Sequence, residues 1–197
     1  MLAANKLNNM LSLNNKNIFF VVIGTAITYA IFFELNIFLF SKLQFIKGVD
    51  WIFLPSGLRL LFVLLFSETG AVGIALASFT IGYEQYYNGD IVNAAMTGCL
   101  SGASPLIARQ VCLGFGHISE NLEGLSTRSL LSIAVIFALT SSLLHQIWYV
   151  AYGQTQDFFT TTAVMAIGDC VGTIVVLYIA KFLIKSTDNK RLDTFAD

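Results

Sequence analysis

Long apolar runs, separated by short polar stretches, divide the chain into segments. A membrane-spanning helix needs roughly 20 mostly apolar residues, within a range of about 17–25. One run, Ile18–Phe40, meets this requirement on its own. The pattern predicts five further spanning helices, at Trp51–Phe66, Gly70–Tyr83, Ile91–Phe115, Ser129–Tyr152 and Thr160–Leu183. We therefore expect an all-α polytopic bundle of about six transmembrane helices within residues 17–185, between a cytoplasmic segment 1–16 and a flexible cytoplasmic tail 186–197.

Helix-breaking residues interrupt the second and fourth runs, and a short polar stretch separates the second run from the third. Only Ser67-Glu68-Thr69 separates the second run from the third, and together these runs are too long for one span. We expect two spans joined by a tight turn, with Gly70 where the chain reverses. Pro55-Ser56-Gly57 and the stretch from Gly98 to Pro105 predict kinks, because proline lacks the backbone donor that a helix needs.

The distribution of positive charge predicts the orientation. Lysine and arginine concentrate on the cytoplasmic side of membrane proteins. With both termini cytoplasmic, only Lys42 and Lys47 lie outside. The cytoplasmic segments then hold Lys6, Lys16, Arg109, Arg128, Lys181, Lys185, Lys190 and Arg191. Aromatic residues that favour the membrane interface gather near the external ends of the runs, at Trp51, Tyr83, Tyr86, Tyr87, Trp148, Tyr149 and Tyr152.

The composition agrees with an integral membrane protein. Apolar residues make up 56% of the chain, charged residues only 12%, and the mean hydropathy is +0.73. These values exclude a soluble enzyme, and a net charge of −1 gives no basic surface for nucleic acid. No HExxH, GxSxG or Walker-type motif is present, so we expect no enzyme activity and no cofactor. The three cysteines show no metal-site spacing, and His117 and His145 fall on opposite sides of the predicted membrane, so we expect no metal site.

Ionisable residues inside the predicted spans are the candidate functional residues. A charge near the bilayer centre costs roughly 2.5–3.5 kcal/mol and usually faces protein or water. At 1.5 Å per residue, Arg59, Asp169, Glu34 and His145 all lie about 9–13 Å below the external surface. Their shared depth predicts a polar pocket open to the outside, with Ser101 beside it. Under the alternative interpretation, Arg59 and Asp169 form a buried ion pair that only orders the bundle.

Small residues predict how the helices pack. Lipid provides no hydrophobic drive for helix association, so close backbone contact is needed. Small residues four apart occur at Gly73 with Ala77 and in two glycine pairs. The predicted packing positions are Gly57, Gly70, Gly73, Gly98, Gly102, Gly168 and Gly172.

Two of these motifs carry a resemblance to a known family. The run Leu54-Pro55-Ser56-Gly57, followed by Gly70, Gly73-Ile74 and Ala77-Ser78, resembles the opening signature of bacterial membrane-associated sensor (MASE-type) domains. The later Ile167-Gly168-Asp169-Cys170-Val171-Gly172 is similar to the Gly-Asp-x-x-Gly element near the end of that family. The resemblance implies a multi-pass input module of the bacterial inner membrane. Two departures are that Arg59 replaces a small apolar residue and that no output domain follows the last span.

These observations predict a sensor-like or ligand-binding membrane protein that acts through a partner. The partner would be another membrane protein or a cytoplasmic signalling protein, since the resemblance implies a histidine kinase or cyclic-di-GMP enzyme. Two alternatives remain open. The predicted architecture is similar to that of the substrate-binding subunits of energy-coupling-factor vitamin transporters, and the small-residue faces also suit a structural subunit of a larger membrane complex.

Overall fold

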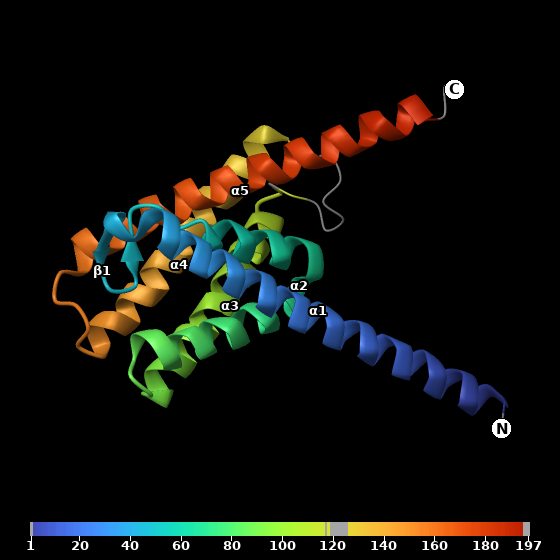
Figure 1. Ribbon diagram of the computed structural model, residues 1–197, viewed down its shortest axis with the longest axis horizontal. Helices are drawn as coiled ribbons and strands as arrows, with labels where there is room; N and C mark the ends of the chain where they lie inside the picture. Colours follow the sequence, from blue (N-terminus) through green and yellow to red (C-terminus); the bar gives the residue numbers. More distant parts are fainter. Residues whose placement is uncertain (1, 117, 119–125, 195–197) are drawn as a thin grey trace.

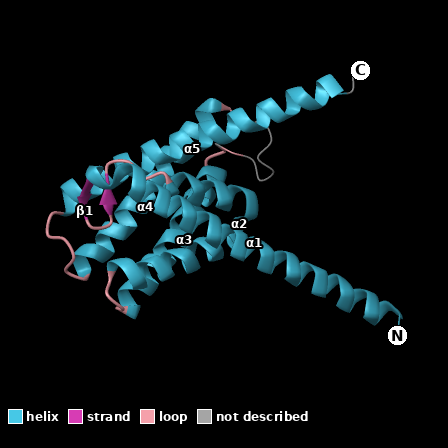
Figure 2. Cartoon of the chain, in the orientation of Figure 1, coloured by secondary structure: helices cyan, strands magenta, loops and turns pink. Residues whose placement is uncertain are grey.

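The structure is a bundle of long helices. The computed structural model describes residues 2–116, 118 and 126–194, and the side chains of 17–116, 118 and 126–182. Its α-helices are α1 (Leu2–Phe40), α2 (Pro55–Ile81), α3 (Ile91–Gly114), α4 (Thr127–Ala151) and α5 (Phe158–Thr194) (Figures 1 and 2). All 5 contain stretches long and apolar enough to cross a membrane, which confirms the predicted helical, multi-pass character. His117 lies outside the described residues.

Shorter elements at one end of the bundle were not predicted. A 3-10 turn, η1 (Ser41–Leu43), leads into an antiparallel hairpin of β1 (Gln44–Ile46) and β2 (Val49–Asp50). A π-helical turn, η2 (Gly82–Tyr86), follows α2. Gly48 occupies the hairpin turn at φ 82°, which residues with a Cβ atom rarely adopt. Figure 1 shows the hairpin at the opposite end of the bundle from both chain termini.

Helix α2 changes direction at Ser67, whose backbone (φ 51°, ψ −129°) is not helical. Residues eight positions apart in a continuous helix are separated by about 12 Å along its axis. Instead, a Cβ atom on Gly70 would lie 2.5 Å from the carbonyl oxygen of Phe62. The chain therefore folds back here, and α2 consists of two helical segments on either side of Ser67.

One predicted helix boundary is wrong. Trp51–Leu54 is not helical, and α2 begins only at Pro55. Proline suits the first helical position because its missing N–H would have no partner there, so Pro55 starts the helix rather than breaking it.

Pro105 does not interrupt α3, which is helical from Ile91 to Gly114, because an interior proline is tolerated where neighbouring groups satisfy the freed backbone. Helices α1 and α5 continue beyond the predicted spans, to Leu2 and Thr194.

The second segment of α2 packs between α1 and α3, while its first segment packs against α5. These contacts are close because they involve glycine: a Cβ on Gly73 would meet Val22 and Thr25 of α1, and one on Gly57 would meet Val176 of α5. All seven predicted packing glycines approach a neighbouring backbone or side chain, namely Gly57, Gly70, Gly73, Gly98, Gly102, Gly168 and Gly172. Helices α4 and α5 complete the bundle around Leu60, Phe137 and Leu177.

Large apolar side chains cover much of the outside of the bundle. Ile31 and Phe38 on α1, and Phe159 and Phe182 on α5, are 61%, 82%, 84% and 72% exposed. Such exposure is unfavourable in water and favourable against lipid tails. On α1 the buried residues form one narrow stripe, Thr25, Tyr29, Phe33 and Asn36. The outer surface is therefore compatible with contact with a lipid bilayer.

Candidate ligand-binding site

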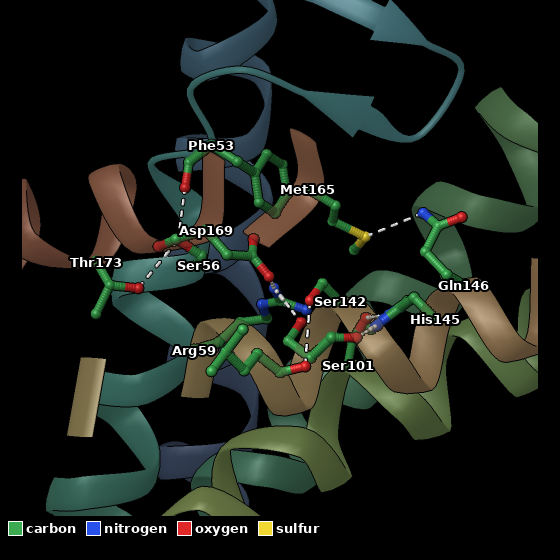
Figure 3. A network of polar contacts seen from close by, with 12 residues as sticks. Phe53, Ser56, Arg59, Ser101, Ser142, His145, Gln146, Met165, Asp169 and Thr173 are labelled. Carbon is green, nitrogen blue, oxygen red and sulfur yellow. Dashed lines mark hydrogen bonds and ion pairs between the residues drawn. The ribbon is translucent and has the colours of Figure 1, made fainter. Parts of the chain in front are cut away.

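An ion pair joins α2 to α5 inside the bundle. Nη2 of Arg59 lies 3.0 Å from Oδ2 of Asp169, and both side chains are about 1–2% exposed. Figure 3 shows the two side chains pointing toward each other. The same nitrogen donates to Ser141 Oγ at 3.0 Å, and the guanidinium carbon lies 5.6 and 5.2 Å from the ring centres of Phe53 and Phe137. These contacts offset part of the cost of removing two charges from water.

Two glycines hold the non-helical segment Trp51–Leu54 against α5. A Cβ on Gly168 would overlap the carbonyl oxygen of Asp50, and one on Gly172 would overlap that of Phe53. The N–H of Phe53 donates to the Gly168 carbonyl at 3.2 Å. Within the Gly-Asp-x-x-Gly sequence, the glycines therefore accommodate the extended backbone while Asp169 turns toward Arg59.

Hydroxyl and amide side chains fix the first turn of α2. The Ser56 hydroxyl lies 2.8 Å from the Asp169 carbonyl oxygen and 3.2 Å from the Thr173 hydroxyl (Figure 3). The N–H of Leu54 donates to Oδ1 of Asn36 at 2.9 Å. These bonds satisfy groups at a helix start that has no side-chain cap of its own. They also set the position of Arg59, one turn further along α2.

His145 on α4 is tied to the same network. Its Nδ1 lies 2.8 Å from the carbonyl oxygen of Ser141, so this nitrogen carries a proton. In the neutral ring Nε2 is then an acceptor, and Ser101 Oγ of α3 lies 3.3 Å from it. Ser141 thus contacts Arg59 through its side chain and His145 through its main chain.

A cavity of about 70 Å³ lies against these side chains. This is well above the roughly 10–15 Å³ that one water molecule requires. Arg59, Ser101, His145 and Asp169 line it, so four of the predicted site residues share one site. Aromatic rings form much of the remaining wall, contributed by Tyr29, Phe33, Phe53, Tyr86, Tyr87 and Tyr149.

Glu34 does not belong to this site. Its side chain is exposed and accepts a hydrogen bond of 2.6 Å from Gln85 Nε2. A depth estimate along the helix axis cannot tell which way a side chain faces, and residue 34 lies outside the buried stripe of α1.

Comparison of the chain with protein families, with curated proteins and with solved structures gives no match. The likeness to membrane sensor domains therefore stays a prediction from the sequence motifs.

Several polar atoms next to the cavity have no partner within the protein. Buried atoms without a hydrogen bond among the described side chains include Arg59 Nε, Asp169 Oδ1 and Ser78 Oγ, and all three residues line the cavity. Leaving such a group unpaired costs roughly 1–3 kcal/mol, and more where it is charged. These atoms are closed off from a water-sized probe, so a bound molecule would reach them only after neighbouring side chains shift.

Asp50 is the main cavity residue that the sequence analysis missed. It ends β2, is partly buried, and lines both the cavity and an outer groove that also contains Gln44, Lys47 and Tyr86. Burial raises the pKa of Asp50 to about 6, and the negative charge of Asp169 adds to this shift. Its position between the cavity and the groove places Asp50 at the cavity entrance.

Three of the five tyrosines that the sequence pattern predicts as interface anchors contribute to the cavity wall, whereas Tyr83 and Tyr152 are exposed. Tyr86, Tyr87 and Tyr149 line the cavity, and Tyr149 is only 4% exposed. The hydroxyls of Tyr87 and Tyr149 lie 3.4 Å apart, and that of Tyr87 also lies 3.0 Å from Thr97 Oγ1.

No group of three or more His, Cys, Asp or Glu within the described residues is arranged to hold a metal ion. The site therefore offers a charged pair, an additional carboxylate and aromatic faces.

Proposed function

We propose that this protein is a ligand-binding membrane sensor whose pocket faces the outer side of the bacterial inner membrane and which acts through a partner protein. One observation carries the proposal: a cavity among apolar helices is lined by the buried Arg59–Asp169 pair together with aromatic rings. A concave, largely apolar site with a few convergent polar groups is typical of small-molecule binding.

The energetics of the ion pair support a functional role over a purely structural one. A buried pair can often be replaced by apolar residues without loss of stability, so packing alone does not require it. A purely structural pair would also be expected to have its remaining polar atoms bonded within the protein. Asp169 Oδ1 and Arg59 Nε instead meet no hydrogen-bond partner within 3.5 Å among the described residues.

The proposed orientation has six membrane crossings and both termini in the cytoplasm. The fold-back of the chain at Ser67 supports counting the two segments of α2 separately. Lys181 Nζ bonds to Thr127 Oγ1 at 3.1 Å, which places the cationic end of the apolar part of α5 beside the start of α4. Positive residues favour the cytoplasmic side, so this end faces inward and the hairpin end faces outward.

Helix α5 provides a route from the pocket to a cytoplasmic partner. Asp169 lies in its outer half, and the helix continues to Thr194, roughly 38 Å further along its axis at 1.5 Å per residue. A ligand that favours one position of Asp169 would shift α5 as a rigid element. A kinase or cyclase is the partner class that the sensor resemblance implies. Copurification of an ATPase would favour the transporter-subunit alternative.

Thermal unfolding in detergent with a panel of small ligands tests the pocket. The panel contains choline, succinate and inositol at matched ionic strength, and the variants are Thr97→Phe and Ala95→Phe. Thr97 lines the cavity, whereas Ala95 is exposed on the same helix. We expect at least one ligand to raise the melting temperature of the wild type and of Ala95→Phe but not of Thr97→Phe. No shift with any ligand, or an equal shift in Thr97→Phe, would count against a ligand-binding cavity.

A further inference from the structure

We infer that the cavity binds a small organic ammonium ion, held by Asp50 and the surrounding tyrosine and phenylalanine rings. The inference rests on the proposed function, because it names the class of ligand for the same pocket. It follows from the balance of charge in the lining and from the aromatic walls.

The charged residues that line the cavity leave one negative charge uncompensated. They are Asp50, Arg59 and Asp169, and Arg59 is paired with Asp169 at 3.0 Å. Within the described residues, Asp50 has no lysine, arginine or histidine nitrogen within the 4.0 Å that defines an ion pair. Lys47 lies in the outer groove with Asp50 and does not line the cavity. A cation entering the cavity would therefore meet an unpaired carboxylate.

The walls suit a cation that carries carbon atoms. A cation is attracted to the face of an aromatic ring within about 6 Å of its centre, and aromatic cages bind quaternary ammonium groups in this way. Tyr86 already accepts such a contact, since Nζ of Lys47 lies 5.5 Å from its ring centre. Because Tyr86 and Asp50 line both the groove and the cavity, a cation that reaches this ring from outside lies beside the carboxylate.

The net charge of the lining points the same way. Asp169 is 1% exposed, and its Oδ2 is paired with Arg59. An anion could accept hydrogen bonds from N–H groups of Arg59, since only Nη2 donates to a partner among the described side chains, but the anion would lie near two carboxylates. The surplus of carboxylates therefore favours a cation over an anion.

The volume restricts the ligand to a small head group. The cavity of about 70 Å³ is smaller than an engineered apolar cavity of roughly 150 Å³ that binds benzene. An ammonium group with a few carbon atoms has the appropriate size, and the rest of a ligand such as choline would extend into the outer groove that Asp50 and Tyr86 also line. The ligand could be a free amine from outside the cell or the head group of a zwitterionic lipid, because both present the same chemistry.

Calorimetric titration of the detergent-purified full chain with choline chloride tests the inference. The neutral isostere 3,3-dimethylbutan-1-ol, sodium succinate and inositol serve as comparisons. We expect choline to bind at least about tenfold more tightly than the neutral isostere. Asp50→Asn should weaken choline binding by about tenfold or more, whereas Glu84→Gln, which removes an exposed carboxylate outside the cavity lining, should leave it unchanged.

A second pair of variants keeps the test decisive if Asp50→Asn folds poorly. Tyr86→Phe retains the ring and should retain choline binding, whereas Tyr86→Leu should lose it. Equal binding of choline and its neutral isostere, or unchanged choline binding in both Asp50→Asn and Tyr86→Leu, would overturn the inference. Binding of succinate or inositol in place of choline would overturn it while leaving the proposed ligand-binding function intact. Absence of binding by every ligand would overturn both.

The source of the cation is resolved by titrating choline into the protein in lipid nanodiscs. If a lipid head group is the natural occupant, nanodiscs of phosphatidylcholine should weaken choline binding relative to nanodiscs of phosphatidylglycerol, by competition. If a free amine is the occupant, the affinities in the two lipids should agree at high ionic strength, where the surface potential of the anionic lipid is screened. Either result supports an ammonium site. Weaker choline binding in phosphatidylglycerol than in phosphatidylcholine would contradict it.

Discussion

Arg59 and Asp169, which are 110 positions apart in the sequence, lie with Nη2 and Oδ2 separated by 3.0 Å inside the helix bundle. Each would be an isolated charge in an apolar environment without the other. The pair also connects the two parts of the chain whose motifs resemble sensor domains, since Arg59 follows Pro55-Ser56-Gly57 and Asp169 follows Gly168. The charged residues of the two motifs and the glycines beside them thus come together where α2 packs against α5.

Removing one partner of the pair should cost more than removing both. We expect Arg59→Leu or Asp169→Leu to lower the free energy of unfolding by roughly 3–5 kcal/mol, because each leaves a buried charge without a partner. The double variant should recover much of this loss. A double-mutant cycle on unfolding in detergent measures the coupling. Additive losses, to within the few tenths of a kcal/mol expected of independent sites, would show that the two charges do not interact.

Gly172 should tolerate no side chain. A Cβ there would overlap the carbonyl oxygen of Phe53, so Gly172→Ala must displace the segment that holds α2 against α5. We expect a loss of roughly 1–3 kcal/mol in unfolding free energy, typical of overpacking. Gly24→Ala is the matched control, because nothing lies within 4 Å of a Cβ at that position. Equal stability of the two variants would contradict the close contact.

The sequence predicted this contact only in part. Glycines four residues apart are visible in the sequence and indicate a close approach on one helix face. They do not show that the partner is the non-helical segment Trp51–Leu54, because the apolar residues of this segment continue the pattern of the following helix. Hydropathy describes only how apolar each residue is. It does not locate the first residue of the helix, which Pro55 determines.

The candidate site was likewise predicted only in part from the sequence. The four residues Arg59, Ser101, His145 and Asp169 could be grouped because charged and polar side chains at similar depth must find partners in an apolar medium. Asp50 could not be added, because it lies in a hairpin for which the helix-depth argument gives no position. Tyr149 resembles an interface residue in the sequence because its place near a helix end suits an anchor and a cavity wall equally well. To tell an interface anchor from a cavity wall, one must know how each helix is rotated about its axis. This follows only from how the helices pack.

Asp50 should make stability depend on pH. Its pKa in the folded protein is raised from 3.8 to about 6, so the folded state retains a proton that the unfolded state has lost between these values. Stability should therefore fall as the pH rises through this interval. The groups around Asp50 are Asp169, Gln44, Tyr86 and Lys47.

Melting temperatures measured in detergent from pH 4 to 7 (roughly the interval between the two pKa values) test this dependence. Asp50→Asn should remove the Asp50 contribution, so its stability relative to the wild type should increase with pH. Glu84→Gln, on an exposed site, should follow the wild-type profile. Parallel profiles for the wild type and Asp50→Asn would show that the carboxyl does not titrate differently in the folded state.

Single cysteines should reveal the proposed orientation. In a background without Cys99, Cys112 and Cys170, a cysteine at Gln154 should react with a membrane-impermeant maleimide added to intact cells. One at Asn189 should react only after permeabilisation. Gln154 lies between α4 and α5 and Asn189 near the end of α5, so the two positions belong to opposite ends of the bundle. Reaction of both from the same side would contradict an odd number of crossings between them.

The most direct test of the account is the accessibility of the cavity from outside. In the same cysteine-free background, Thr97→Cys lines the cavity, whereas Ser104→Cys lies on the same helix, is fully buried and does not line it. The measurement is the rate of modification in intact cells by two permanently charged methanethiosulfonates, one cationic (trimethylammonium) and one anionic (sulfonate). The account predicts that Thr97→Cys reacts and Ser104→Cys does not, and that the cationic reagent reacts faster than the anionic one. Protection of Thr97→Cys from both reagents, or equal reaction of the two cysteines, would contradict an outward-facing pocket.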